Sequence, residues 1–263
     1  KFNAESEGMW IAATGSSSHK SSDMPSTSFS SNRYGWRLGA QGIVSEHVRA
    51  GFGLSIENVT SNSGSLDKST GISYLAGASL KGVFGGTVLA GTFAAGYDSY
   101  NVQRAIDLPL GPSYVDDGTQ DFAYLSAHSR ISHTFGNQTA YLRPHLDLGV
   151  THIFGSDFSE SGDSPLDVNV SQPAHTMVTV NTGVELGAEI ATDAGTVVRP
   201  FAGAGVLFVP VGSDPGLSGT FAGEPSAAPF TVDDKIDDTA LDLRLGFDMV
   251  TGPGLSVRAM ASA

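Results

Sequence analysis

The stretch 139–154 constrains the possible folds more than any other, because its apolar and polar residues alternate over about fifteen positions. Successive side chains of a β-strand point to opposite faces. One face would carry the apolar residues Ala140, Leu142, Pro144, Leu146, Leu148, Val150 and Phe154. The other would carry Tyr141, Arg143, His145, Asp147 and Thr151. Strands of soluble sheets usually have about 5 or 6 residues, whereas a membrane-crossing strand needs roughly 9 to 11. The stretch therefore predicts a strand that crosses a membrane.

The composition limits how such a chain can enter a membrane. No run approaches 18 consecutive apolar residues, so the sequence predicts no transmembrane helix. A closed β-barrel is the other structure that satisfies its backbone polar groups inside a bilayer. The length of 263 residues suits a single barrel domain. The chain has no Cys, which excludes disulfides and thiolate zinc sites.

The charge is acidic and unevenly distributed. A formal net charge of −13 argues against nucleic acid as a partner. Five Ser-, Gly-, Pro- or Asp-rich connections hold 16 of the 27 acidic residues but only 5 Lys or Arg, a net of −11: 15–33, 58–71, 100–121, 155–174 and 211–238. Most of the excess charge is therefore expected in loops, which leaves the strands nearly neutral.

Alternation elsewhere in the chain predicts eleven strands, with 139–154 as the seventh. The others are 8–14, 34–44, 48–56, 72–81, 87–99, 123–135, 178–190, 198–208, 241–249 and 255–261. The connections between them alternate long and short along the whole chain. This pattern is typical of outer-membrane barrels, which have short periplasmic turns and longer external loops.

The predicted fold class is all-β, a transmembrane antiparallel up-and-down β-barrel. Single-chain bacterial barrels have an even number of strands, so 12 strands are expected with about 11 present. We expect residues 1–263 to form one barrel domain whose last strand lies beyond Ala263. Pro144 and Pro200 fall inside predicted strands, each after an Arg, and would each remove a backbone donor. They count against strands at these positions unless a β-bulge occurs at each of them.

With the strands in place, the sequence resembles the C-terminal translocator β-barrel domain of autotransporters, the type V secretion proteins. The resemblance covers nearly the whole chain and rests on the order and spacing of several motifs. They are Gly8-Met-Trp-Ile-Ala12, Tyr34-Gly-Trp-Arg-Leu-Gly-Ala-Gln41, Val48-Arg-Ala-Gly-Phe-Gly53, Tyr141-Leu-Arg-Pro-His-Leu-Asp147, Phe158-Ser-Glu-Ser-Gly162, Thr182-Gly-Val-Glu-Leu-Gly187 and Arg199-Pro-Phe-Ala-Gly203.

The resemblance implies an outer-membrane barrel that enables export of an N-terminal passenger domain to the bacterial cell surface. It also implies several partners: outer-membrane lipid and lipopolysaccharide, the protein's own passenger and a linker helix held in the lumen, and the barrel-assembly machinery. The family's passenger and linker would precede Lys1, and its terminal aromatic residue would follow Ala263.

The phase of each strand assigns fourteen charged or imidazole side chains to the inside of the barrel. They are Arg37, Arg49, Glu57, Lys81, His128, Arg130, Arg143, His145, Asp147, Glu185, Glu189, Arg199, Asp242 and Arg244. We interpret this set as a hydrated lumen wall of mixed sign. The same charges would also suit a held helix or a hairpin in transit. No catalytic residue, metal site or cofactor is expected.

Two alternatives remain open. The first is a small outer-membrane channel or adhesin barrel without a passenger, in which the loops are the functional part. The second is an outer-membrane enzyme, in which Arg143, His145 and Asp147 gather around a substrate or an ion. Residues upstream of Lys1 distinguish a translocator from a channel, because only the translocator has a passenger.

Overall fold

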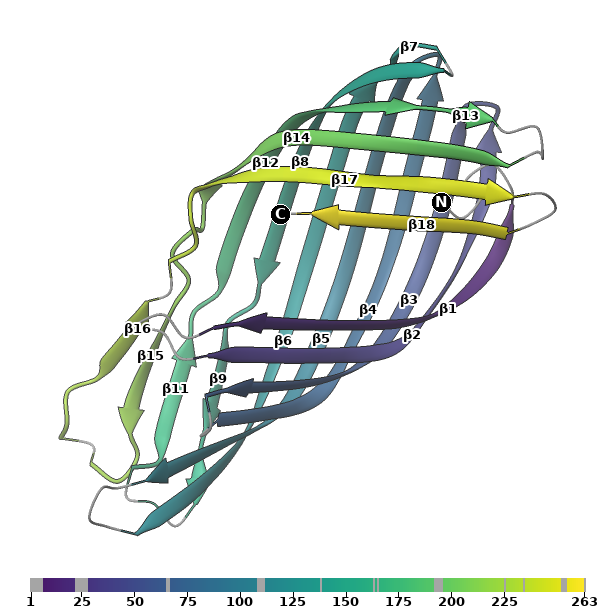
Figure 1. The fold of residues 1–263 in the computed structure, drawn as a ribbon. Coiled ribbons are helices and arrows are strands. Elements are labelled where there is room, and N and C mark those ends of the chain that lie inside the picture. Colours follow the sequence, from purple (N-terminus) through teal and green to yellow (C-terminus); the bar gives the residue numbers. More distant parts are fainter. Residues whose placement is uncertain are drawn as a thin grey trace.

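The computed structural model describes residues 7–21, 28–64, 67–107, 112–137, 139–162, 164, 166–191, 196–224, 226–233, 235–251 and 255–262. Within them, eleven strands pair one after another into an antiparallel wall, which confirms the expected all-β fold (Figure 1). The wall consists of β1 (Gly8–Lys20), β2 (Phe29–Ser45), β3 (Val48–Ser63), β4 (Asp67–Phe84), β5 (Thr87–Asp107), β6 (Ser113–His133), β8 (Ala140–Ile153), β12 (His175–Ala188), β14 (Val197–Val211), β17 (Thr239–Thr251) and β18 (Leu255–Ser262). Among the same residues, no helix is long and apolar enough to cross a membrane.

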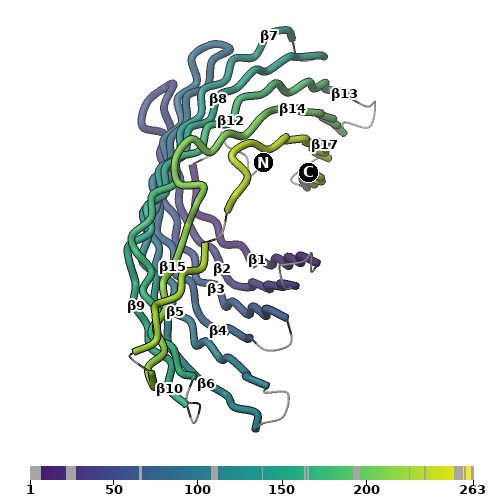
Figure 2. Tube along the Cα trace, turned by 90° about the vertical axis from the view of Figure 1, so that its left-hand side faces the viewer, coloured from purple at the N-terminus to yellow at the C-terminus, as the bar shows by residue number. Residues whose placement is uncertain are grey.

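The wall curves strongly, so that it has a concave and a convex face (Figure 2). Its edge strands in the described structure are β1 and β18. Because every neighbouring pair in the wall is antiparallel, the first and the eleventh strand run in the same direction. These two edges therefore cannot close the wall by antiparallel pairing with each other.

The burial pattern is the reverse of that of a soluble protein. Leu146, Leu148 and Val150 are exposed, whereas the alternate residues His145 and Asp147 are half-buried. The fully buried apolar side chains of the described residues are few: Val59, Val168, Val170, Phe201 and Val209. A large exposed apolar surface marks contact with an apolar environment. The wall therefore has one face on which large apolar side chains are exposed.

Three of the predicted loops are mostly strand instead. The β1–β2 hairpin pairs from Gly8 out to Lys20 and Phe29, β3 and β4 pair out to Ser63 and Asp67, and β5 and β6 pair out to Asp107. Ser, Asn and Asp favour turns because their side chains bond to nearby backbone. Here the backbone hydrogen bonds continue from the apolar part of each hairpin into its polar end. Backbone pairing does not require apolar side chains.

The other two predicted loops, 155–174 and 211–238, also contain strands. They form a separate antiparallel sheet, which we call the small sheet: β9 (Ser156–Ser159), β11 (Val168–Gln172), β15 (Gly216–Phe221) and β16 (Phe230–Asp233). The connections β8–β12 and β14–β17 form this sheet, which lies at the end of the wall where β5 ends and β6 begins (Figure 1). A short strand, β10 (Ser161–Gly162), ties this region to β6.

The bulges expected at the two prolines are absent. At Pro144 the β6–β8 ladder stops after Ser132 pairs with His145, and it resumes in the same register where β7 (Phe135–Gly136) pairs with Leu142. The gap therefore lies where Pro144 has no N–H to donate.

Pro200 repeats this arrangement. The β12–β14 ladder stops at Gly187 and resumes unshifted where β13 (Ile190–Ala191) pairs with β14. An interrupted partner strand, rather than an extra residue, accommodates each proline. The register shift that does occur in β12 lies elsewhere, between Val178 and Val180.

Candidate functional site

The fourteen side chains predicted to face inward form the candidate site, which we call the polar face. They come from eight strands of the wall and the short segment after β12. Residues paired directly across an antiparallel ladder point to the same side of the sheet. In the described structure, ten of the fourteen form five ion pairs: Arg37–Glu57, Arg130–Asp147, Arg143–Glu185, Arg199–Glu189 and Arg244–Asp242.

The densest part of the polar face joins β6, β8 and β12. Arg130 and Asp147 are directly opposite each other across β6 and β8, with Arg130 Nε 2.5 Å from Asp147 Oδ1. Arg143 and Glu185 are opposite across β8 and β12, and Arg143 Nη1 lies 2.9 Å from Glu185 Oε1. Tyr141 donates its hydroxyl to the same Glu185 oxygen at 2.8 Å. The Arg143 guanidinium also lies 4.5 Å from the centre of the Tyr141 ring. These contacts tie three strands together.

A second group lies between β1, β2 and β3. Glu57 is only 8% exposed and accepts hydrogen bonds from Arg37 Nη2 at 2.6 Å, Thr14 Oγ1 at 3.2 Å and Ser55 Oγ at 3.3 Å. A buried carboxylate needs such partners to offset its lost hydration. Gly35 lies opposite Glu57, and a Cβ there would be 2.9 Å from Glu57 Cγ and closer still to backbone. The missing side chain at Gly35 makes room for the carboxylate.

The two Arg-Pro pairs, Arg143-Pro144 and Arg199-Pro200, accommodate the proline in the same way. At each interrupted ladder, the Arg before the proline bridges the gap with its side chain. Arg143 Nε donates to Thr134 Oγ1 at 3.1 Å, and Arg199 Nε donates to Glu189 Oε2 at 2.7 Å. A side-chain bond thus stands where the backbone bond is missing.

The remaining members of the polar face are Arg49, Lys81, His128 and His145. Arg49 is directly opposite Lys81 across β3 and β4, which places two positive side chains together. His128 shares a 2.8 Å hydrogen bond with Ser126. Nε2 of His145 is buried and has no hydrogen-bond partner in the described structure.

The geometry does not assemble the catalytic cluster considered from the sequence. Arg143 turns to Glu185 on one neighbouring strand, and Asp147 turns to Arg130 on the other. No group of three or more His, Asp or Glu side chains among the described residues is arranged to hold a metal ion. Each member of the Arg143, His145 and Asp147 stripe thus has its own cross-strand surroundings.

A set of aromatic rings that was not predicted lies over glycines of the neighbouring strand. Trp10 covers Gly39, where a Cβ would be 2.6 Å from the ring. Other such pairs in the described wall are Tyr100 over Gly71, Tyr124 over Gly96, Tyr141 over Gly187 and Phe201 over Gly246. Recognising this set requires the strand register, which alternation alone does not give.

Comparison with known proteins gives a consistent result. The sequence model of a protein family described as the autotransporter beta-domain matches residues 9–262. No curated protein matches the chain significantly.

Solved structures match the fold of nearly the whole chain. The translocator domain of autotransporter NalP from Neisseria meningitidis is 15% identical, with a TM-score of 0.66, and the match covers 97% of this chain and 82% of that one. The beta domain of the Bordetella autotransporter BrkA is 18% identical, with a TM-score of 0.61 and coverages of 97% and 91%. The transport unit of the autotransporter AIDA-I from Escherichia coli is 11% identical, with a TM-score of 0.55 and coverages of 100% and 86%.

Proposed function

Because the chain belongs to the autotransporter beta-domain family, we propose that its polar face lines the passage through which the N-terminal passenger is exported. As a family member, the protein is a translocator of the Gram-negative outer membrane. One face of the wall exposes large apolar side chains that suit the bilayer, and the other is the polar face. A polypeptide in transit would contact the polar face.

The observation that carries this proposal is the set of five ion pairs within the polar face. They neutralise ten of the fourteen charged or imidazole groups of the polar face in place. Unpaired charges of one sign would bind segments of opposite sign and repel others. A wall of mixed, internally paired charges stays hydrated without selecting the sequence that passes. Such a wall suits a conduit for a whole passenger domain.

A further strand is part of the proposal. The two edge strands of the described wall run in the same direction, so one strand between them satisfies both edges by antiparallel pairing. Open edges are not stable in a bilayer, because backbone groups there have no water to bond. We propose that a twelfth strand closes the barrel between β18 and β1. This strand would also remove an exposed template for aggregation.

The proposed partners follow from the two faces. The exposed apolar side chains would contact outer-membrane lipid, and the long hairpins at the small-sheet end would meet lipopolysaccharide. The polar face would hold the linker helix of the passenger. Insertion of the barrel would require the barrel-assembly machinery. We assign no catalytic role, since Arg143 and Asp147 of the candidate triad each pair with a residue on a different neighbouring strand.

Cysteine crosslinking in the full-length protein tests which face contacts the passenger. The chain has no cysteine of its own, so single cysteines are specific probes. Ala94 faces the same side as Ser126, and its neighbour Ala95 faces the opposite, exposed side. With a passenger that carries one cysteine and is stalled during export, Ala94→Cys should crosslink and the matched Ala95→Cys should not. Equal crosslinking at both positions, or none at Ala94→Cys, refutes the proposal.

The alternative of a channel or adhesin barrel without a passenger makes a different prediction. The coding sequence upstream of Lys1 would then encode no passenger domain, and deleting it would not change what appears on the cell surface. For a translocator, the upstream region encodes a folded domain that protease added to intact cells can reach. Reading that region and shaving intact cells decides between the two.

A further inference from the structure

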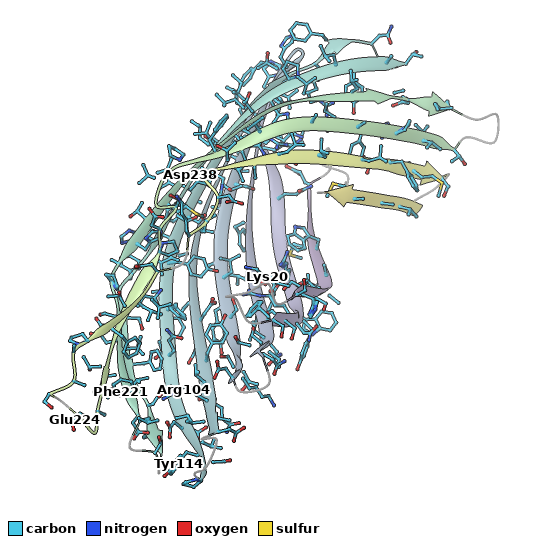
Figure 3. All side chains as sticks on the ribbon, turned by 60° about the vertical axis from the view of Figure 1, so that its left-hand side comes forward. Lys20, Arg104, Tyr114, Phe221, Glu224 and Asp238 are labelled. Atoms are coloured by element: carbon cyan, nitrogen blue, oxygen red, sulfur yellow. The ribbon has the colours of Figure 1, made fainter. Side chains whose placement is uncertain are left out.

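A cluster of acidic residues surrounds one arginine at the end of the wall that carries the small sheet. Arg104 on β5 is directly opposite Asp67 on β4 and Asp116 on β6. Glu160, between β9 and β10, and Asp167, just before β11, complete the cluster. Figure 3 shows Arg104 at this end of the wall, with Tyr114 and Phe221. The cluster lies where the long hairpins extend beyond the apolar part of the wall.

Arg104 binds the segment 156–172 to the β5–β6 hairpin. Its Nε lies 2.9 Å from Glu160 Oε1, and its Nη2 contacts Glu160 Oε2. The same Nη2 lies 2.9 Å from the carbonyl oxygen of Leu166 and 3.3 Å from Asp116 Oδ2. Glu160 also accepts a hydrogen bond from the backbone N–H of Val168 at 3.2 Å. One guanidinium thus fastens two points of the small-sheet region, Glu160 and Leu166, to the wall, and Glu160 in turn holds Val168.

The charges of this cluster do not balance. Among the described residues the cluster holds four carboxyl groups, Asp67, Asp116, Glu160 and Asp167, but one guanidinium, which pairs directly with Asp116 and Glu160. If all were ionised, these five groups would have a net charge of −3. The Asp116 side chain has no exposed surface, and that of Glu160 is 4% exposed. Carboxylates that share a buried site cannot all ionise without a large cost.

Two of the carboxyl oxygens show where the imbalance is concentrated. Oδ1 of Asp116 and Oδ1 of Asp167 are both buried, and neither has a hydrogen-bond donor in the described structure. The two side chains are close enough to hydrogen-bond to each other. Gly162 lies against Asp116, where a Cβ would be 2.3 Å from Oδ1. Two facing carboxylates have acceptors only, so a proton on one of them supplies the missing donor.

The direction of the pKa shifts agrees with this geometry. Burial, together with the neighbouring Asp167 carboxyl, raises the pKa of Asp116. Burial also raises the pKa of Asp67, against the opposing effect of Arg104.

We propose that Asp116 and Asp167 share one proton, and that this shared proton latches the segment 156–172 and the small sheet onto the β5–β6 hairpin. When the pH rises, the proton passes to water and leaves two facing carboxylates. Their repulsion works against the Arg104 contacts and loosens the segment. The small-sheet end of the wall is therefore sensitive to pH. The segment 156–172 is held more tightly as the surroundings become more acidic.

Hydrogen–deuterium exchange in the full-length protein in lipid tests this latch. Exchange of the segment 156–172, corrected for the intrinsic pH dependence of amide exchange, should be slow at pH 5 and faster at pH 9. Release of one proton on opening gives up to about a tenfold change in protection for each pH unit above the folded-state pKa. Flat, corrected protection of the wild-type segment across this range overturns the proposal.

Substitutions identify the groups responsible. Asp116→Asn replaces the shared proton with an amide N–H, so protection of the segment should become independent of pH. Asp117→Asn is the matched control, because exposed Asp117 accepts a bond from Gln103 at 2.9 Å and lies outside the cluster. It should behave as wild type. Asp167→Asn places the amide on the other partner and should also abolish the pH dependence.

The variants remain informative if one of them does not assemble. Assembly is checked by heat-modifiable mobility in gels, and either amide variant that assembles suffices. Should neither assemble, Asp67→Asn tests the same point, since it removes the other carboxyl group of the cluster whose pKa is raised and should leave the pH dependence of segment 156–172 in place. Wild-type pH dependence in either amide variant, or its loss in Asp67→Asn, overturns the proposal.

Discussion

Gly187 provides the most direct test of how the polar face is built. A Cβ at this position would lie 2.3 Å from both Cζ and Oη of Tyr141. Gly187→Ala must therefore push the Tyr141 ring away from β12. The displaced hydroxyl loses its 2.8 Å bond to Glu185, and the ring loses its contact with the Arg143 guanidinium.

The expected magnitude follows from these two losses. A hydrogen bond to a charged group contributes about 1.5–3 kcal/mol net, and an exposed cation–π contact about 0.5–1 kcal/mol. Replacing Gly by Ala in a strand returns about 0.5–1 kcal/mol. Gly187→Ala should thus lower the free energy of unfolding by about 1–3 kcal/mol.

The matched control is Gly203→Ala. Gly203 lies on β14 directly opposite Glu185, but a Cβ there would be 3.5 Å from its nearest neighbour, an ordinary contact. This variant should be unchanged or slightly more stable. Equilibrium urea unfolding in lipid vesicles, followed by the emission of Trp10 and Trp36, measures both. Equal stability of Gly187→Ala and Gly203→Ala would refute the idea that Tyr141 requires a glycine beneath it.

Further substitutions test the other features. Pro144→Ala should change the free energy of unfolding by no more than about 0.5 kcal/mol, because the β6–β8 ladder is already interrupted there. Leu146→Pro lies within both ladders of β8 and should lower the free energy of unfolding by several kcal/mol in lipid. A similar loss for both variants in urea unfolding would contradict the interrupted ladder at Pro144. Arg143→Lys should lose part of the contacts to Thr134 and Glu185 and destabilise the barrel by about 1–2 kcal/mol despite its retained charge; unchanged stability would mean that charge alone matters. An acid with a raised folded-state pKa stabilises the fold below its unfolded pKa, and this contribution is lost as the pH rises through the folded value. Asp67→Asn should therefore slow amide exchange at the tip of β4 and β5 at pH 8 and change little at pH 4, and the opposite order would contradict the raised pKa of Asp67.

Much of the fold could be predicted from the sequence, because a lipid-facing strand repeats every two residues. The alternation at 139–154 predicted β8, and all eleven strands of the wall lie where alternation placed them, although most are longer. The extended polar ends of β2 and β3 could not be predicted, since Ser and Asn suit turns and solvated ladders equally well. Likewise, the sequence showed that Arg143-Pro144 and Arg199-Pro200 were alike, but the bulges expected there are interrupted partner strands.

The candidate site divides in the same way. Alternation grouped Arg143, His145 and Asp147 on one polar face, because side-chain direction in a strand is a local property. Whether these residues form a cluster is decided between strands. Register pairs Arg143 with Glu185 and Asp147 with Arg130, so the apparent triad is two separate ion pairs. The buried group around Arg104 had no local signal at all, because its members are up to 100 residues apart from Asp67 to Asp167.

The sequence by itself therefore determined the class of fold, the polar and apolar sides of each strand and the family, since all three depend on local periodicity and the order of motifs. Only the tertiary structure decided which charges neutralise each other, which glycines lie under aromatic rings, and where four carboxyl groups meet one guanidinium. The physical reason is that strand register and the path of the long hairpins bring distant residues within hydrogen-bonding distance. Those distances set the electrostatics of both the polar face and the acidic cluster.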